Sequence, residues 1–517
     1  MSQPPPRTGR FQYSALVPVL CLFVVYILSR LHHVLAMPPF IDEFLHIQWA
    51  QDVYSGHFLT GAANGRLLAL WWMALFQLSG DGLLWTTRTV TLLFGLIAVA
   101  AVYNLGQVLA SRCAGLLAAV FYILAPFTFF HDRLGLSDAY VSTLGILALW
   151  FSVRYARQGR DLDAILAGLS LTTAITVKAT GLMLIALPVL ALFLLIPWAR
   201  WKRIVRGSVL CYAAFGLTWG PFYLFMRSRG WSYFGVAVSV VGTDKISGVL
   251  ERFAANVATA WMLDTGYLSL AVPVLFAVLA VYLIIRHRRV GLLLMLGTLL
   301  PLVMILAFAT KVSGRYILLH IPVLILGLAI GLAVLASDLR QRGGWLGTLA
   351  VPLTVAIPLV WGILFAVPYQ IQMMGNPASV MLPGDDQMEY IEGDSSGFAL
   401  DTAANYLLTV ASQRTMPLRV VGLLANCGGL GLELPTHGRV TLECPPINFD
   451  GSQQQALAAL VNRRASEAAS FDLWMVSENS PYISLDGITA PYDKVITFDR
   501  PGGLVHVSLY HVDKAGS

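Results

Sequence analysis

Two stretches of the chain carry carboxylates that could do acid–base chemistry at the edge of a membrane. Asp42 and Glu43 are adjacent and follow the first long apolar segment, and Asp138 opens a later one. Carboxylates in such places are costly unless they are paired, hydrated or used, and a positioned carboxylate can accept the proton of a hydroxyl. Helix capping explains each stretch separately, but the two together favour a catalytic interpretation.

Basic residues that could hold a phosphate lie near the ends of other apolar segments. They are Arg66, Arg133, Lys178, Lys311 and Arg315, with Tyr316 directly after the last of them. Charge-assisted hydrogen bonds from lysine and arginine are a common way to hold a phosphate. Structural roles remain open: Lys178 could snorkel to the interface, Arg66 could be a plain loop charge, and residues 311–315 could form a charged turn.

The elements that must position these residues are membrane helices. The chain has 517 residues, of which 57% are hydrophobic and 12% charged, and its mean hydropathy is +0.70. The charged share is about half that of soluble proteins, which excludes a soluble enzyme, a nucleic-acid binder and a disordered scaffold. Recurring apolar runs predict an all-α membrane domain with about eleven transmembrane helices. We expect these at 15–37, 83–109, 113–130, 139–156, 163–178, 180–198, 207–226, 267–285, 290–309, 316–336 and 345–367.

The charges divide the chain into two parts and orient it. Residues 369–517 carry 8 Lys and Arg against 16 Asp and Glu, whereas residues 1–368 carry 26 against 12. Alternate loops, starting with the amino terminus, are basic, as cytoplasmic loops usually are. We therefore expect a multi-pass protein of the plasma (inner) membrane with a cytoplasmic amino terminus. The carboxylates and the basic candidates then share the outer face.

The acidic carboxyl-terminal part has the pattern of a small soluble α/β domain. Short β-branched runs at 418–423, 439–442, 471–476, 494–498 and 504–509 alternate with turn residues, and 456–469 has a helical pattern. The sequence predicts a transmembrane domain over 1–368 and an extracytoplasmic domain over 369–517, with loop composition at 375–397. Cys427 and Cys444 both fall outside the membrane, where disulfides persist, and we expect them to be bonded.

Together these motifs resemble those of the GT-C membrane glycosyltransferases, in the branch that holds the protein O-mannosyltransferases and the lipid A aminoarabinose transferases. That branch carries an acidic pair in its first outer loop, which Asp42-Glu43 matches. It also has an Arg-x-x-x-x-Asp motif entering the fourth span, which Arg133 and Asp138 match. The resemblance covers about 35–340 and depends on the order, spacing and sidedness of motifs that are individually weak.

Three further motifs extend the resemblance, one of them with a departure. Residues 176–181 are similar to a Thr-Lys-x-x-x-Gly-like turn before the sixth span, and residues 311–322 fit a Lys-x-x-x-Arg-Tyr-x-x-x-x-x-Pro run near the last spans. The family usually has Lys-Pro-Pro-Leu where residues 65–68 are Gly-Arg-Leu-Leu. Arginine in place of lysine keeps the charge but changes the geometry.

The resemblance implies an inverting transferase that moves a sugar from a polyprenyl-phosphate donor to an acceptor hydroxyl on the extracytoplasmic face. Asp42 would be the base, Glu43 would position it or the acceptor, and Asp138 would contact the acceptor or orient Arg133. The residues implied in substrate binding are Arg66, Arg133, Lys178, Arg315 and Tyr316, with Lys311 in reserve. One base and a single displacement need no covalent intermediate.

The expected partners are the lipid-linked donor, membrane lipids and an acceptor that is a protein, a lipid or a glycan of the cell envelope. No cofactor is expected. A divalent metal, as in the related oligosaccharyltransferases, would need several oxygen ligands, for which Asp42, Glu43, Asp132 and Asp138 are candidates, but metal-free chemistry is favoured. The alternative function is a secondary transporter, which predicts repeats and charges within the spans, whereas the ionisable residues here gather at one membrane edge.

Overall fold

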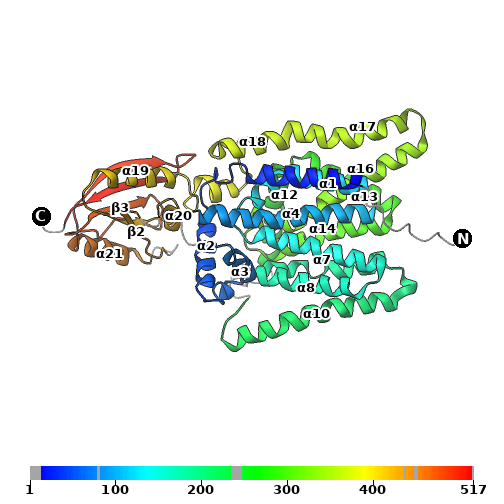
Figure 1. Ribbon diagram of the computed structural model, residues 1–517, viewed down its shortest axis with the longest axis horizontal. Helices are drawn as coiled ribbons and strands as arrows, with labels where there is room; N and C mark the ends of the chain where they lie inside the picture. Colours follow the sequence, from blue (N-terminus) through cyan, green and yellow to red (C-terminus); the bar gives the residue numbers. More distant parts are fainter. Residues whose placement is uncertain (1–12, 78–81, 234–246, 436–437, 448–451, 515–517) are drawn as a thin grey trace.

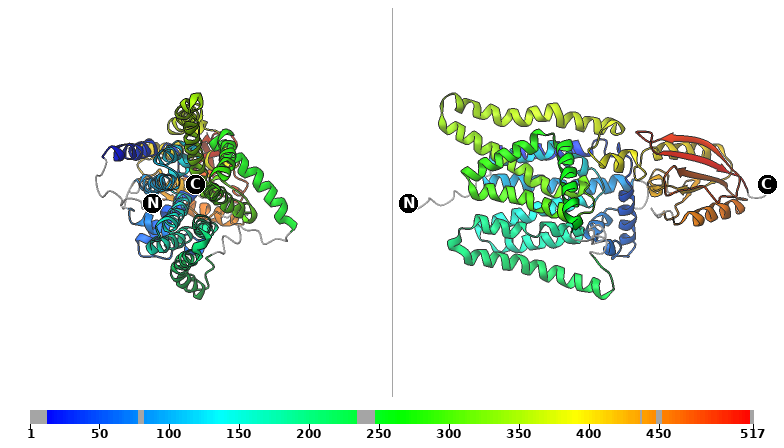
Figure 2. Two further views of the ribbon diagram at one scale, coloured as in Figure 1. Left: turned by 90° about the vertical axis from the view of Figure 1, so that its right-hand side faces the viewer. Right: turned by 180° about the vertical axis from the view of Figure 1, so that it is seen from behind.

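The computed structural model describes residues 13–77, 82–233, 247–435, 438–447 and 452–514. Long helices run side by side as a bundle, and a small α/β domain stands at one end of it (Figures 1 and 2). Two shorter helices, α2 (Ile41–Tyr54) and α3 (Leu68–Ala74), lie between the bundle and that domain (Figure 1). The expected architecture, a helical part followed by an α/β part, is therefore present.

The helices of the bundle differ widely in length. In chain order they are α1 (Tyr13–Leu31), α4 (Leu83–Leu109), α5 (Arg112–Leu124), α6 (Pro126–Asp132), α7 (Asp138–Gln158), α8 (Asp161–Val177), α9 (Leu187–Leu195), α10 (Trp201–Ser228), α12 (Ser247–Leu268), α13 (Ala271–Arg286), α14 (Arg288–Phe308), α15 (Gly314–Ile317), α16 (Ile321–Arg342), α17 (Gly344–Trp361) and α18 (Val367–Gly375).

Six helical segments in the described ranges are long and apolar enough to cross a membrane, or up to eight if each bent helix pair is one span. The bends are 63° between α5 and α6 and 103° between the segments 250–268 and 271–286. The expected count of about eleven is not confirmed, because residues 17–31 and 179–195 form shorter apolar segments and α8 has only 17 residues. An apolar run shows which residues avoid water, but it does not show where a helix stops or bends.

The most enclosed helices carry residues of the expected site. In an apolar stretch of 18 residues in α7, 72% of the residues are buried, and in an equally long stretch of the segment from Gly314 to Arg342 the share is 89%. Asp138 begins α7, and Arg315 lies at the start of the second segment. Asp138 and Arg315 thus lie at the ends of helices that are packed against other helices on most sides. Such rigid helices fix the positions of the side chains that they carry.

The α/β domain is built on one five-stranded sheet. Its strands are β1 (Leu418–Leu423), β2 (Val440–Glu443), β3 (Asp472–Glu478), β4 (Tyr492–Asp499) and β5 (His506–Val512), in the order β2-β1-β3-β5-β4. β1 is parallel to β2 and β3, whereas β5 is antiparallel to β3 and β4. All five strands were expected within a few residues.

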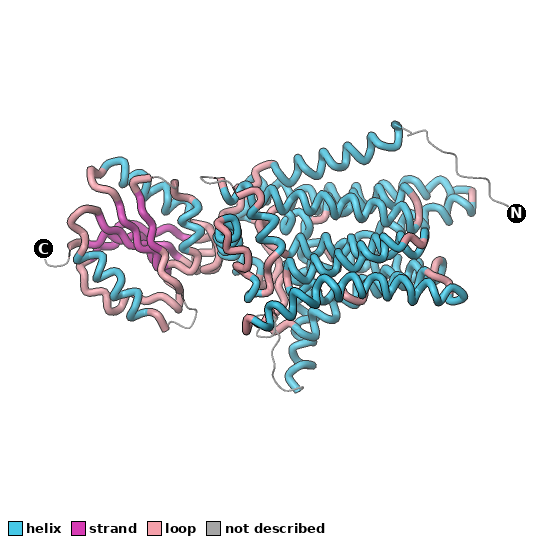
Figure 3. Tube along the Cα trace, turned by 60° about the horizontal axis from the view of Figure 1, so that its bottom comes forward, coloured by secondary structure: helices cyan, strands magenta, loops and turns pink. Residues whose placement is uncertain are grey.

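Helices cover both faces of this sheet (Figure 3). One apolar core lies under α19 (Leu400–Gln413) and α20 (Cys427–Leu432), and the other lies under α21 (Gln454–Ser466). α21 matches the expected helix, but α19 and α20 were not predicted. Cys427 and Cys444 form the expected disulfide, which joins α20 to the end of β2 with their Cα atoms 5.7 Å apart.

Residues 376–399, here called the connector, join α18 to the α/β domain and pack against the bundle. The Ile41 N–H donates to the Ser395 carbonyl at 3.1 Å, next to Asp42. From the α/β domain, the Asn426 side chain donates to the Pro39 carbonyl at 2.8 Å, and Arg500 donates to the Gly393 carbonyl at 2.6 Å. The start of α2 is therefore held by the connector and the α/β domain together.

Candidate active site

Five of the expected site residues come from separate elements and meet at the end of the bundle that faces the α/β domain. Asp42 is the second residue of α2, Asp138 the first of α7 and Arg315 the second of α15, while Arg66 precedes α3 and Lys178 follows α8. The distances given below connect all five. The sequence prediction that these charges converge in one place is therefore consistent with the structure.

Asp42 is held by two arginines. Arg315 Nη1 donates to Asp42 Oδ2 at 2.6 Å, and Arg66 Nη2 lies 3.6 Å from the same oxygen. Burial acts to raise the pKa of Asp42, but the charges of Arg315 and Arg66 outweigh it and hold the pKa well below its usual range. Asp42 is thus an ionised carboxylate at neutral pH, and 19% of its side chain is exposed to an incoming molecule.

His46, one helical turn after Asp42, orients Arg66. Arg66 Nη1 lies 2.8 Å from His46 Nε2, and because arginine can only donate, Nε2 must accept. Nδ1 therefore carries the proton and donates to the Gly135 carbonyl at 2.9 Å. Burial and the Arg66 charge lower the pKa of His46 to about 4, so the ring is neutral. The spacing of four residues from Asp42 on one helix is the sequence signal for this residue.

Asp138 and Lys178 form a second ion pair beside the first. Lys178 Nζ donates to Asp138 Oδ1 at 2.6 Å, and the side chains of Lys178 and Asp138 are only 8% and 6% exposed, respectively. The Tyr316 ring centre lies 4.9 Å from Lys178 Nζ and 5.3 Å from the guanidinium carbon of Arg315. Tyr316 thus contacts a cation of each pair, an attractive arrangement for an aromatic ring.

Glu43 does not share the surroundings of Asp42. Its carboxylate accepts hydrogen bonds from Arg88 Nε at 2.8 Å, from Arg88 Nη2 at 2.7 Å and from the Gly135 N–H at 2.6 Å, and both charged side chains are fully buried. It also accepts from the Phe40 N–H at 3.0 Å, which caps α2. The expectation that Glu43 contacts the acceptor is therefore corrected, because a fully buried carboxylate cannot reach it. Glu43 fixes the start of α2 to α4 and to the loop before α7, and it can position Asp42 only through that helix.

Arg133 and Lys311 also lie elsewhere than expected. Arg133 donates to the carbonyls of Ser29, His32 and His33 at 3.3, 2.9 and 2.5 Å, so it holds the end of α1 and does not contact Asp138. Lys311 lies 3.1 Å from Asp385, and 64% of its side chain is exposed. We correct both assignments: Arg133 is a structural residue, and Lys311 belongs to the rim of the site.

The connector adds acidic residues that the sequence analysis did not identify. Glu389 Oε1 lies 3.5 Å from Arg315 Nη2, and Glu389 also accepts from the Ser313 hydroxyl at 3.1 Å. Asp386 accepts from the Tyr267 hydroxyl at 2.7 Å and from the Gly314 N–H at 3.1 Å. Asp386 and Glu389 thus fix the turn that carries Arg315. The only sequence signal was a group of acids within a stretch of loop composition.

We expect Asp386 to make the stability of the protein depend on pH. Burial raises the pKa of Asp386 to about 6, above its unfolded value, so its contribution is fully present below about pH 4 and is lost as the pH rises through about 6. The size is on the order of 3 kcal/mol. Unfolding midpoints of Asp386→Asn in detergent should vary less between pH 4 and 7 than those of the unmodified protein. The half-exposed neighbour Asp385 provides the control Asp385→Asn, and equal pH profiles for all three proteins would contradict the assignment.

No three His, Cys, Asp or Glu side chains converge as a metal site in the part of the chain that the structure describes. Of the four candidate ligands, Glu43 is bonded to Arg88, and Asp132 accepts from the hydroxyls of Tyr26 and Tyr122 at 3.0 and 3.5 Å. Asp42 and Asp138 each face a cation. Metal independence stays a prediction.

Comparison with known proteins identifies the class of fold. The sequence model of the dolichyl-phosphate-mannose-protein mannosyltransferase family matches residues 65–219, a range that holds Arg66, Asp138 and Lys178 but not Asp42 or Arg315. No curated protein sequence matches the chain significantly. Together with the solved structures described next, this match confirms the predicted resemblance: the chain has the fold of the GT-C glycosyltransferases.

Within that class, the structure is similar to ArnT from Cupriavidus metallidurans over nearly the whole of both chains. The form bound to undecaprenyl phosphate aligns over 98% of this chain and 99% of ArnT, with 16% identity and a TM-score of 0.61. The apo state gives 15% identity and a TM-score of 0.60 over 96% and 97%. The oligosaccharyltransferase of Archaeoglobus fulgidus, in complex with zinc and sulfate, aligns over 96% of this chain and 73% of that protein, with 11% identity and a TM-score of 0.50.

Proposed function

We propose that this protein is an integral membrane glycosyltransferase that moves a sugar from a polyprenyl-phosphate donor to an acceptor hydroxyl, with inversion at the anomeric carbon. The observation that carries the proposal is the ionised Asp42 between Arg315 and Arg66, with Lys178 on the other side of Tyr316. A carboxylate and several cations in one partly enclosed place are the groups that such a transfer needs. The ArnT structure with undecaprenyl phosphate supports a lipid phosphate as the anion.

In the proposed reaction the acceptor oxygen forms a bond to the anomeric carbon as the bond from that carbon to the donor phosphate breaks. The acceptor proton passes to Asp42, and the electron pair of the broken bond leaves with the lipid phosphate. Arg66, Lys178 and Arg315 stabilise the negative charge that develops on the leaving group. Such fixed charges contribute much of the rate enhancement in many enzymes.

The Asp42–Arg315 contact implies that Asp42 becomes an effective base only after the donor has bound. With no anion bound, Arg315 and Arg66 keep the pKa of Asp42 low, and a carboxylate of low pKa is a weak base. A donor phosphate that takes up hydrogen bonds from the two arginines offsets their charge and raises the basicity of Asp42. The base is therefore strengthened when the donor is in place.

The site needs no cofactor for this chemistry, and we propose that it acts without a metal. The localisation also remains a proposal: the inner membrane, with the amino terminus in the cytoplasm and the site and α/β domain outside. The acceptor is a protein, a lipid or a glycan reached from that side.

The direct test is transfer in vitro by the purified full chain, with synthetic polyprenyl-phosphate sugars as donors and release of the polyprenyl phosphate as the signal. Inversion is read from the anomeric configuration of the product by NMR. The proposal expects turnover in the presence of EDTA. Absence of turnover with every donor, together with solute flux in proteoliposomes, would favour a transporter instead.

We expect Arg66→Gln to weaken donor binding by about 10- to 100-fold, because a charge-assisted hydrogen bond contributes about 1.5–3 kcal/mol. Lys311→Gln provides the matched control, since it also removes one positive charge but lies on the exposed rim, paired with Asp385. The dissociation constant of a polyprenyl phosphate, measured by tryptophan fluorescence, should change less than threefold in the control. Equal losses in both variants would contradict a specific phosphate contact by Arg66.

A further inference from the structure

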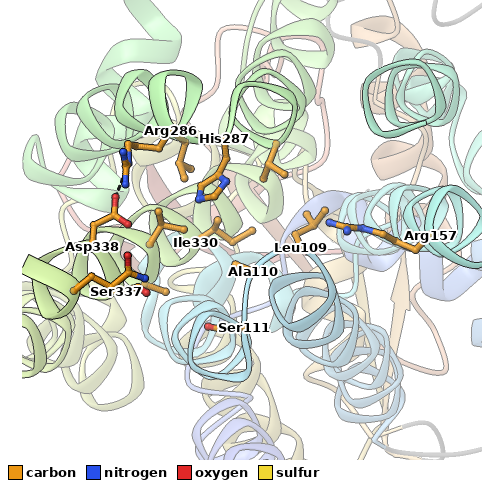
Figure 4. Close-up of a pocket in the computed structure, with 14 residues that line it drawn as sticks. Leu109, Ala110, Ser111, Arg157, Arg286, His287, Ile330, Ser337 and Asp338 are labelled. Carbon is orange, nitrogen blue, oxygen red and sulfur yellow. Dashed lines mark hydrogen bonds and ion pairs between the residues drawn. The ribbon is translucent and has the colours of Figure 1, made fainter. Parts of the chain in front are cut away.

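A cavity of about 570 Å³ opens among helix ends of the bundle (Figure 4), away from the site that contains Asp42. Helix α7 gives its distance from the site: Asp138 begins the helix at the site, and Arg157, near the other end, lines the cavity. Nineteen positions at the α-helical rise correspond to about 28 Å. The cavity is therefore about one hydrocarbon thickness away from the site and faces the opposite leaflet.

The lining of the cavity has an apolar zone and a polar zone. The apolar zone consists of Leu109, Leu283, Val290, Ile330, Ala333 and Val334. The polar zone includes Arg157, Arg286 and Ser337, from α7, α13 and α16, and Ser111 and His287, from the turns after α4 and α13 (Figure 4). A volume of this size is typical of ligand pockets, and the two zones match a molecule with a polar head and an apolar tail.

Charge in the cavity is positive and only partly balanced. Arg286 Nε donates to Asp338 at 2.6 Å, and the Tyr282 hydroxyl donates to the same carboxylate at 2.6 Å, so the acid on the lining already has its partners. Arg157 is exposed and has no hydrogen-bond or ion-pair partner among the described residues. Basic residues at helix ends are common, but that role does not account for a cavity of this size beside Arg157 and His287.

We propose that this cavity binds an anionic phospholipid of the leaflet opposite the site. Its phosphate lies against Arg157 and His287, and the first part of an acyl chain lies against Leu109, Ile330 and Val334. Basic pockets between membrane helices are suited to anionic headgroups. A free phosphate would use the polar zone alone, so the apolar zone favours a lipid as the source of the anion.

The test uses the full chain, delipidated in neutral detergent and titrated with phosphatidylglycerol while the bound lipid is counted by native mass spectrometry. We expect phosphatidylglycerol to bind more tightly than phosphatidylcholine. Arg157→Gln should weaken it by about fivefold, the effect typical of one basic residue at an anionic lipid surface. Arg160→Gln is the matched control, because Arg160 is an exposed arginine of the same turn that does not line the cavity, and binding should change less than twofold.

A second variant tests the contribution of the apolar zone to lipid binding separately from that of the positive charge. Ala333→Phe fills the apolar zone without changing any charge, and we expect it also to weaken the binding of phosphatidylglycerol. Equal binding of phosphatidylcholine, or equal effects of Arg157→Gln and Arg160→Gln, would overturn the proposal. Inorganic phosphate at millimolar concentration could also bind in the cavity. If its binding required Arg157 but was unaffected by Ala333→Phe, the ligand would be a free anion and the proposal would be overturned.

Discussion

Asp42→Asn is expected to reduce the rate of sugar transfer by about 10²- to 10⁴-fold, the usual contribution of a positioned general base. The amide keeps the shape of the carboxylate but cannot take up the acceptor proton. Folding should change little, because 19% of the Asp42 side chain is exposed and Arg315 keeps Glu389 as a second acidic partner. The rate is measured by release of polyprenyl phosphate under single-turnover conditions.

The matched control for this substitution is Asp52→Asn, on the same helix and with the same chemical change. Asp52 lies near the other end of α2, where it is partly exposed, and its replacement should leave transfer within twofold. Donor binding should persist in Asp42→Asn, because Arg66, Lys178 and Arg315 remain. Normal turnover by Asp42→Asn would remove Asp42 from the mechanism and leave the cations as a binding site only.

Glu43→Gln is expected to lower the free energy of unfolding by about 3–5 kcal/mol, the cost of leaving a buried charge without its partner. Arg88, fully buried, donates to Glu43 through two of its nitrogens and also to the carbonyls of Val34 and Met37 at 2.8 and 2.6 Å. An amide at position 43 would present an N–H₂ group to donors that need an acceptor. The midpoint of thermal unfolding in detergent measures the effect.

The contrast between two neighbouring carboxylates is the decisive part of this experiment. Asp42→Asn should lose activity and keep stability, whereas Glu43→Gln should lose stability, and the fraction that remains folded should keep a near-normal rate. The double variant Glu43→Leu/Arg88→Met removes both charges and should recover part of the lost stability, since a buried ion pair can often be replaced by apolar groups. A stable but inactive Glu43→Gln protein would restore the catalytic role that the structure argues against.

The α/β domain and the helical bundle were both predictable, but the number of spans was not. Short β-branched runs between turn residues predicted all five strands, because β-branched side chains pack well on the pleated surface of a sheet. The bend between α5 and α6 occurs at Pro126, where α6 starts. Whether such a bent segment crosses the membrane depends on what packs beside it, and a hydropathy window contains no information about neighbours.

The candidate residues of the site could be predicted from residue types alone: Asp42, Arg66, Asp138, Lys178 and Arg315 stand out because charge beside an apolar segment is costly without a use or a partner. Which of these charges meet depends on how the helices and the connector pack. Consecutive residues on a helix point about 100° apart, so Asp42 faces Arg315 while Glu43 faces Arg88. The connector brings Asp386 and Glu389 to the same turn from more than seventy positions away along the chain. Such contacts depend on how the segments pack, and no local pattern of residue types specifies them.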